Sequence, residues 1–339
     1  MDELFVPELL SGGLILSYTC NSRCKHCMYA CSPQWKADWF PEPDAERILR
    51  QMAGKIQGSP QGPDRIGINH GLHFTGGEPF LNFDLLLDLT QKAHDLHIPS
   101  TFVESNCFWC IDDVTTREKL TQLKNAGLHG ILISVNPFIL EYVPFERTER
   151  AVRISEAIFK GNVMLYQGFF YHQFQRLHIA DALSFDTYLR MAGDHSLSRN
   201  ELLVRGRACY DLGYLYAKHP AKRFFGSSCR AELTRPWHIH IDNYGNYMSG
   251  YCGGLSLGDA EHLTSLRHIG LEDKPILAAL VTDLKTLYEF AVKDFEYKDR
   301  VEGYVSKCHL CVDIRKHISR QTAAFTELRP RAFYQQLTS

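Results

Sequence analysis

The residues best suited to chemistry in this chain are three closely spaced cysteines near its start. Cys20, Cys24 and Cys27 lie in the segment Cys-Asn-Ser-Arg-Cys-Lys-His-Cys, a C-x3-C-x2-C pattern that follows a short apolar run. Thiolates at this spacing are typical metal ligands, and three of them leave one position of a four-cysteine shell unfilled. A structural zinc would need a fourth ligand, for which Cys31 and His26 are nearest. A [4Fe–4S] cluster would instead keep one iron open for a substrate or cofactor.

A second motif, Phe-Thr-Gly-Gly-Glu-Pro, occupies residues 74–79 and follows another apolar run. Gly76 and Gly77 allow backbone groups to approach a ligand closely, and Glu78 can accept a hydrogen bond from an ammonium group. The two motifs, in this order and each after an expected strand, closely resemble the radical SAM superfamily. The resemblance covers roughly residues 12–225.

The resemblance implies a cofactor and a set of residues that contact it. Cys20, Cys24 and Cys27 would bind a [4Fe–4S] cluster whose open iron chelates the amine and carboxylate of S-adenosylmethionine (SAM). Reductive cleavage of SAM would then give a 5′-deoxyadenosyl radical that removes hydrogen from a substrate. The residues expected to contact SAM are Gly76, Gly77 and Glu78 at its amino group, His26 near the adenine, Ser134 at the ribose or carboxylate, and Asn106.

Four further cysteines in the last third of the chain form a second candidate metal site. Cys229 and Cys252 precede the pair Cys308 and Cys311, which has C-x2-C spacing. The layout resembles the SPASM/Twitch extension of radical SAM enzymes but lacks the later cysteines of the full pattern, which implies one auxiliary [4Fe–4S] cluster. A four-cysteine zinc site is the alternative, because ligand type alone does not separate zinc from iron. Cys209 is a possible substitute ligand.

Other reactive side chains have less certain roles. Cys107 and Cys110 follow an expected strand and could donate hydrogen to a substrate radical, form a redox disulfide, or pack in the core. His238 and His240 alternate on one face of an expected hairpin and could be ligands or ordinary buried histidines.

The composition limits the class of protein. Lysine and arginine total 37 against 39 acidic residues, so the formal net charge is −2, which argues against general capture of nucleic acid. No apolar run approaches the roughly 18 residues that cross a bilayer, and the first residues do not resemble a secretory signal. An odd number of cysteines, 11, cannot all pair, and we expect a reducing, cytoplasmic location without membrane or nucleic-acid partners.

Alternating apolar and amphipathic segments predict the elements that position these residues. We expect an α/β fold, because hydrophobic strands separated by helices pair in parallel. The expected strands are 14–18, 71–75, 100–105, 130–135 and 163–171, and the expected helices 43–56, 82–96, 115–127 and 145–161. Since ligands gather at the carboxyl ends of such strands, the two motifs should meet there.

The last third of the chain has a different texture. A hairpin is expected at 238–252, a helix at 275–295, and a second helix starting at 308–311. With the family resemblance, the expected architecture is a partial (β/α)6 TIM-type barrel over residues 1–225 and a small α+β cluster-binding extension over 226–339.

The expected activity is hydrogen abstraction from a peptide or protein side chain, or from a small polar metabolite, followed by net oxidation or bond formation. An external one-electron donor such as flavodoxin or ferredoxin would reduce the first cluster. The alternatives are an epimerase in which Cys107 or Cys110 returns the hydrogen, and a non-catalytic iron–sulfur protein with a redox or scaffold role.

Overall fold

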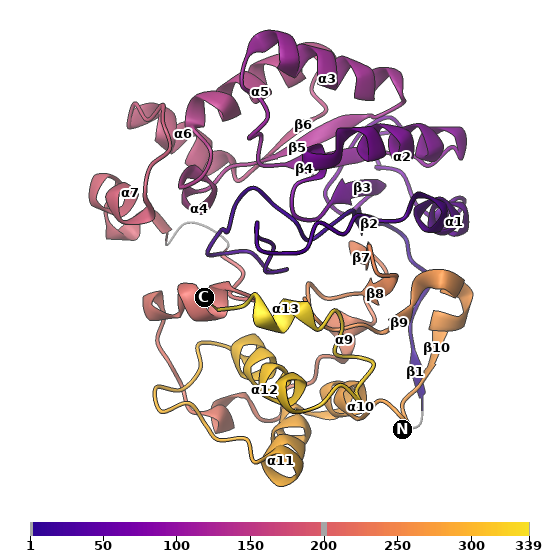
Figure 1. Cartoon of the computed structure of the whole chain (residues 1–339), viewed down its shortest axis with the longest axis vertical. Coiled ribbons are helices and arrows are strands. Elements are labelled where there is room, and N and C mark those ends of the chain that lie inside the picture. Colours follow the sequence, from indigo (N-terminus) through magenta and orange to yellow (C-terminus); the bar gives the residue numbers. More distant parts are fainter. Residues whose placement is uncertain (1–2, 198–201, 339) are drawn as a thin grey trace.

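The fold is organised around one open, mostly parallel sheet with the order β6-β5-β4-β3-β2-β7-β8-β9. A computed structural model describes residues 3–197 and 202–338 (Figure 1). Within those residues β6 and β9 are the sheet's edges, so the expected α/β fold with a partial, unclosed barrel is confirmed. The parallel strands of the first half are β2 (Gly12–Ile15), β3 (Leu72–Thr75), β4 (Phe102–Ser105), β5 (Gly130–Ser134) and β6 (Val163–Tyr166).

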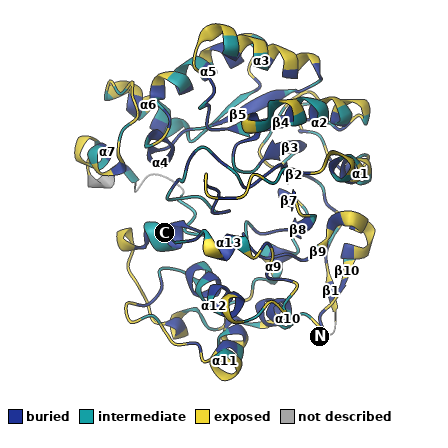
Figure 2. Cartoon of the chain, viewed as in Figure 1, coloured by how far each residue is buried: buried dark blue, intermediate teal, exposed yellow. Residues whose placement is uncertain are grey.

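Helices cross over between these strands, as parallel pairing requires. They are α1 (Glu42–Met52), α2 (Phe83–Asp95), α3 (Asp113–Asn125) and α5 (Phe145–Phe159). Side chains cap two of them: Asn82 accepts from the backbone of Leu85, and Asp112 from that of Thr115. Figure 2 shows β2, β3, β4 and β5 largely buried, whereas β6 is half-buried and α2, α3 and α5 expose their outer faces. The central strands therefore lie in a layer shielded from water, and this buried layer anchors the loops at their ends.

The strand expected at 163–171 is wrong in its second half. β6 ends at Tyr166, and α6 (Gly168–Arg176) follows. The aromatic run suggested a strand because aromatic side chains favour sheets. However, Phe170 and Phe174 stand four residues apart and are both buried, which is the spacing of one helix face.

The expected hairpin is present, and it extends the main sheet. β7 (Ile239–Asp242) and β8 (Asn246–Met248) pair antiparallel, and β9 (Gly258–Asp259) follows. β7 also pairs in parallel with β2, on the side away from β3. The sheet therefore crosses the expected domain boundary at 225/226, which stays a prediction.

The remaining C-terminal helices gather at the end of the molecule opposite α3 and α5 (Figure 1). The single helix expected at 275–295 is two helices, because Asp283 is extended and its side chain accepts from the backbone of Lys285 to start the second. These helices are α10 (Pro275–Thr282), α11 (Leu284–Phe295), α12 (Lys307–Gln321) and α13 (Ala332–Gln335).

Shorter elements complete the described chain. The helices α4 (Pro137–Leu140), α7 (Phe185–Ala192), α8 (Ala208–Asp211) and α9 (Arg230–Leu233) join the larger ones, and β1 (Glu3–Phe5) pairs with β10 (His268–Gly270). Among the described residues, no helix combines the length and apolar character needed to cross a membrane.

Candidate active site

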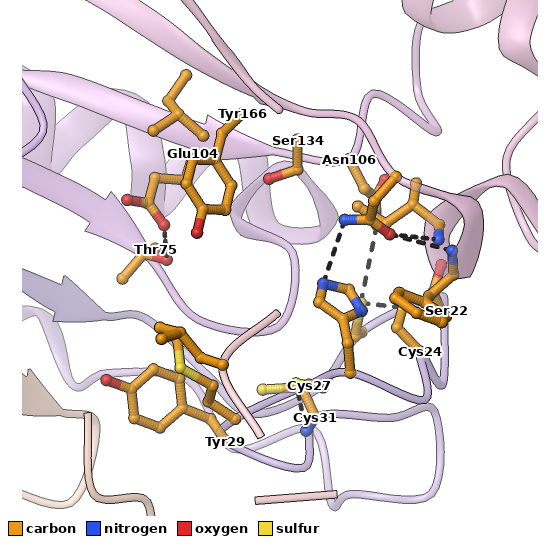
Figure 3. Close-up of a pocket in the computed structure, with 18 of the residues that line it drawn as sticks. Ser22, Cys24, Cys27, Tyr29, Cys31, Thr75, Glu104, Asn106, Ser134 and Tyr166 are labelled. Carbon is orange, nitrogen blue, oxygen red and sulfur yellow. Dashed lines mark hydrogen bonds between the residues drawn. The ribbon is translucent and has the colours of Figure 1, made fainter. Parts of the chain in front are cut away.

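A cavity of about 250 Å³ lies at the carboxyl ends of the parallel strands. Residues that follow each of the five parallel strands β2 to β6 contribute to its wall, so residues distant in sequence meet there (Figure 3). The sequence-predicted residues that line it are Cys20, Cys24, His26, Cys27, Gly76, Gly77, Glu78, Asn106 and Ser134. The structure therefore brings together all the residues expected to hold the first cluster and SAM, although their roles remain predictions.

The three cysteines of the first motif differ in how strongly their surroundings favour a thiolate. The Sγ of Cys20 accepts hydrogen bonds from the backbone N–H of Ser22 at 3.4 Å and from the side-chain amide of Asn106 at 3.8 Å. The Sγ of Cys27 accepts from the backbone of Cys31 at 3.3 Å. Burial raises the pKa of Cys20 and Cys24, whereas the hydrogen bond from the Cys31 side chain lowers the pKa of Cys27 to about 6. Donors aimed at sulfur favour the anionic form that iron or zinc binds.

The side chain of Arg207 is fully buried and packs against this cysteine loop. Its guanidinium donates to the backbone carbonyls of Cys24, Ala30 and Cys31 at 3.0, 2.6 and 3.0 Å. Its positive charge also lowers the pKa of Cys27, as a smaller effect than the hydrogen bond from Cys31 and than burial. The loop is thus both fixed and placed beside a cation, which suits a negatively charged thiolate cluster.

The glycines of the second motif serve the packing of the two motifs against each other. A side-chain carbon on Gly77 would lie 1.9 Å from the carbonyl oxygen of Thr19, and one on Gly76 would lie 2.4 Å from that of Ser17. The Gly77 amide donates to the Ser17 carbonyl at 2.7 Å. We expected these glycines to let backbone groups approach a ligand closely, which stays a prediction, and the amide of Gly77 is already bonded within the protein. Their absent side chains let the second motif lie on the cysteine loop.

The carboxylate of Glu78 is buried at the cavity wall and is well supplied with donors. Its Oε1 accepts from the backbone N–H of Phe80 at 3.2 Å and from the Ser105 hydroxyl at 3.0 Å. Its Oε2 accepts from the backbone N–H of Asn106 at 2.8 Å. Burial raises its pKa to about 7 despite these bonds. Because a carboxylate has about four acceptor positions, one remains for a ligand's ammonium group.

One ring nitrogen of His26 has no hydrogen-bond partner among the residues that the structure describes. Its ring stacks on Phe138 with 5.0 Å between centroids, and its Nε2 lies 3.2 Å from the amide nitrogen of Asn136. The buried Nδ1 has no hydrogen-bond partner among the described residues, and burial lowers the pKa of the ring to about 4. A neutral, stacked imidazole with an unused nitrogen is suited to a planar heteroaromatic ligand.

Sequence reasoning missed an acidic residue on the opposite wall. Glu104 on β4 lines the cavity, and its Oε2 accepts from the Thr75 hydroxyl at 2.7 Å. Burial raises the pKa of Glu104 to about 7. Figure 3 shows Glu104 and Thr75 near the ring of Tyr166 and away from Cys24. A carboxyl group directly after the apolar pair Phe102 and Val103, inside an expected strand, was the signal that could have identified it.

Three histidines lie close together, and one of them, His73, is a neighbour of Glu104. His238 and His240 of the hairpin line the cavity, and the imidazole of His73 from β3 lies 3.0 Å from that of His240, between their Nε2 atoms. Burial lowers the pKa of all three rings, so they are neutral near pH 7. His238 and His240 were left open as ligands in the sequence, and His73 was not identified.

The four cysteines of the expected auxiliary site are electrostatic neighbours. Cys308 and Cys311 stand three residues apart near the start of α12, on one face, and the helix is capped by the Ser306 side chain. Burial, followed by the negative charges of Cys311, Cys252 and Cys308, raises the pKa of Cys229. The helix N-terminus favours thiolates because its dipole is positive there.

Cations surround this second cysteine group. Arg205, Lys307 and Arg315 each have cysteines of the group among the charges that shift their pKa upward, although burial opposes the shift. Cys308 and Cys311 likewise raise the pKa of the buried Cys209, after the larger effect of burial. The charge pattern fits an anionic cluster, and Cys209 is close enough to stay an alternative ligand.

Cys107 and Cys110 are fully buried and are not among the residues that line the cavity. Two arginines of α5 hold their loop: Arg147 donates to the carbonyl of Phe108, and Arg150 donates to that of Cys110 at 2.6 Å. This placement favours packing over hydrogen donation, and a catalytic role for either thiol stays an untested prediction.

Comparison with known proteins matches part of the chain to a protein family. The radical SAM superfamily model matches residues 14–176, which confirms the resemblance predicted from the two motifs. No curated protein matches the chain. Similar solved structures include BtrN in complex with AdoMet and 2-DOIA, at 13% identity over 79% of this chain and 83% of that chain, with a TM-score of 0.45.

Two other solved structures are similar. Histidine-tagged anSMEcpe with bound AdoMet is 12% identical over 93% of this chain and 98% of that chain, with a TM-score of 0.45. Streptococcus suis SuiB bound to precursor peptide SuiA is 13% identical over 82% of this chain and 68% of that chain, with a TM-score of 0.37. Likenesses at this level carry no argument about substrate.

Proposed function

This chain carries a radical SAM superfamily domain at residues 14–176, and from this premise we propose that it is a radical SAM enzyme with one auxiliary cluster that oxidises its substrate or forms a bond in it. The observation that supports the proposal best is the convergence of Cys20, Cys24 and Cys27 with Glu78 and His26 on one cavity.

The chain's own residues fit a [4Fe–4S] cluster and SAM. Cys20, Cys24 and Cys27 would hold the cluster, with hydrogen bonds already directed at two of the sulfurs. The spare acceptor position of Glu78 would receive an ammonium group, and the unpartnered Nδ1 of His26 would meet a heteroaromatic ring. When bound, this pair of cofactors supplies a 5′-deoxyadenosyl radical that removes hydrogen from an unactivated carbon.

The position of the auxiliary cysteines supports net oxidation. Tyr251 lines the cavity, and Cys252 is the next residue. Tyr29 also lines the cavity, and its pKa is raised first by burial and then by the charges of Tyr251 and Cys252. Cys229, Cys252, Cys308 and Cys311 would hold a cluster on the side of the cavity that Tyr251 lines, and this cluster would supply an acceptor for the electron left on a product radical.

The polar wall suggests the substrate class. Glu104, Tyr29, His238 and Tyr251 line the cavity together with apolar residues such as Phe170 and Leu132. A peptide side chain or a small polar metabolite fits this mixture. An external flavodoxin or ferredoxin would deliver the electron to the first cluster.

The basic test is cleavage of SAM by anaerobically reconstituted protein with dithionite. The wild-type chain should form 5′-deoxyadenosine, and the Cys24→Ala variant should form none above background. A wild-type protein that binds iron but yields no 5′-deoxyadenosine would favour the non-catalytic alternative.

Oxidation and epimerisation differ in their products. With peptide and polar-metabolite fractions as substrates in deuterated water, oxidation gives a product lighter by two hydrogens and without deuterium at the new site. Epimerisation would leave the composition unchanged except for one solvent-derived deuterium. Normal turnover by a Cys110→Ala variant would exclude that thiol as the hydrogen donor.

A further inference from the structure

The three-histidine group is built around a glycine on the strand between its members. In the sheet, Gly13 of β2 is paired with His73 of β3 on one side and with His240 of β7 on the other. A side-chain carbon on Gly13 would lie 2.3 Å from the Nε2 of His73. The missing side chain therefore lets two imidazoles meet across β2, where any other residue would separate them.

One nitrogen from each of His73, His238 and His240 lies within 4.8 Å of the other two. In the part of the chain that the structure describes, no other group of three histidine, cysteine, aspartate or glutamate side chains meets this spacing. For comparison, nitrogens on a tetrahedral ion at about 2.05 Å are about 3.3 Å apart. The Nε2 atoms of His73 and His240 share a hydrogen bond at 3.0 Å, so an ion that displaced the proton between them would find two ligand nitrogens near this separation.

The outer nitrogens of two rings are held by other groups. The Nδ1 of His238 lies 2.6 Å from the carbonyl oxygen of Ile68, and the Nδ1 of His240 lies 2.9 Å from the hydroxyl of Tyr29. A carbonyl can only accept, so His238 carries its proton on Nδ1 and has a lone pair on Nε2. Such contacts to the second ring nitrogen orient histidine ligands in metal sites.

An acidic group completes the surroundings. The Oε1 of Glu104 lies 3.9 Å from the Nε2 of His73, and Glu104, His238 and His240 all line the cavity. The three rings are buried, with 6% or less of each residue exposed. A cation at this point would therefore be shielded by protein on one side and face the cavity on the other.

We propose that His73, His238 and His240 bind one divalent transition-metal ion, with Glu104 beside it and an open position toward the cavity. Neutral imidazole ligands suit zinc, cobalt, nickel, copper and iron. The open position would hold an oxygen of the substrate, such as a carboxylate or hydroxyl. The site is separate from both cysteine groups, and the ion can bind whether or not the proposed reaction takes place.

The test is cobalt binding by the protein with its iron–sulfur clusters in place. After a chelator has removed mononuclear ions without oxygen, Co²⁺ alone is added by equilibrium dialysis, and cobalt and iron are measured per chain. We expect one saturable cobalt per chain, with absorption bands of nitrogen and oxygen ligation and no sulfur-to-cobalt charge transfer.

Variants assign the site to the histidines. His240→Gln and His238→Gln should each weaken cobalt binding at least tenfold while iron content and circular dichroism stay normal, and His172→Ala, at an exposed position on α6, should bind as the wild type does. The proposal is overturned if the wild type shows no saturable site, if its spectrum shows sulfur ligation, or if well-folded histidine variants bind cobalt normally. The wild-type spectrum decides alone if the variants fail to fold.

Discussion

The guanidinium of Arg207 lies 3.0 Å from the backbone carbonyl oxygen of Cys24, in the middle of the cysteine loop. Arg207 comes from the segment just before α8, and it reaches the loop across 183 positions of sequence. The same side chain also contacts the carbonyl of Gln336 at 3.3 Å, near the C-terminal helix α13. The buried guanidinium of Arg207 therefore links the cysteine loop to the segment before α8 and to the end of α13.

Replacing Arg207 should loosen the cysteine loop. An Arg207→Met variant leaves several buried carbonyls without donors, and we expect a loss of about 3 kcal/mol in the free energy of unfolding, because each such group costs about 1–3 kcal/mol. Iron bound at the first site should fall with it. Urea unfolding of the cluster-free chain and iron analysis measure both effects. Arg117→Met, at an exposed position of α3, is the control, and equal behaviour of the two variants would contradict the assignment.

Gly77→Ala should separate the two motifs. The added carbon would lie 1.9 Å from the Thr19 carbonyl oxygen, and its nearest neighbours are backbone atoms that cannot move aside as a side chain can. We therefore expect the free energy of unfolding to fall by about 1–3 kcal/mol. Iron bound at the first site should also decrease. The matched control is Gly270→Ala, where an added carbon meets nothing within 4 Å. Normal iron content in Gly77→Ala protein would show that the close packing is not needed.

The auxiliary site should lose its iron independently of the first. If two [4Fe–4S] clusters are present, wild-type protein holds about eight irons per chain, and a Cys252→Ala variant should hold about four. Cys209→Ala should keep the wild-type value if Cys209 is not a ligand. Full iron content in the Cys252 variant, or zinc in place of iron in protein purified without oxygen, would rule out the auxiliary cluster as described.

Glu104 should make stability depend on pH in a specific direction. Its pKa is raised to about 7 in the fold, so the folded protein binds a proton that the unfolded chain releases near pH 4.3. The stability tied to this proton is present below about pH 4.3 and is lost as the pH rises through about 7. The side chain is 23% exposed, so we expect a modest effect of about 2 kcal/mol.

The comparison is between wild-type and Glu104→Gln protein, both free of metal. The amide oxygen of glutamine can still accept from Thr75, so the variant removes the titration and keeps the hydrogen bond. Wild-type stability relative to the variant should fall between pH 5 and 7.5 in urea unfolding. Parallel curves for the two proteins over this range would show that Glu104 is ionised throughout.

The sequence predicted the parts of the site that follow from local patterns. The spacing of Cys20, Cys24 and Cys27 and the Gly-Gly-Glu motif lie in short segments, and parallel strands must bring their ends to one edge. The family match at residues 14–176 agrees with this. The pairing of β7 with β2 was not predicted, because strand pairing over 200 residues leaves no local trace, and the expected boundary at 225/226 stays a prediction.

The same limitation explains the missed residues. His73 and His240 come together only because β2 lies between their strands with Gly13 at the matching position, which depends on sheet order and register. Arg207 stands two residues before Cys209 in the sequence, but its burial against the cysteine loop depends on packing between distant segments. The α6 error has a local cause, since the aromatic residues there fit both a strand and a helix.

The central claim is that Cys20, Cys24 and Cys27 hold an iron–sulfur cluster with one iron open to SAM. The most direct measurement is electron paramagnetic resonance of the dithionite-reduced Cys252→Ala protein, in which the first cluster is the expected signal, before and after addition of SAM. We predict a cluster signal that changes shape when SAM is added and that is absent when Cys24 is also replaced by alanine. A signal that SAM leaves unchanged, or one that survives the loss of Cys24, would contradict the claim.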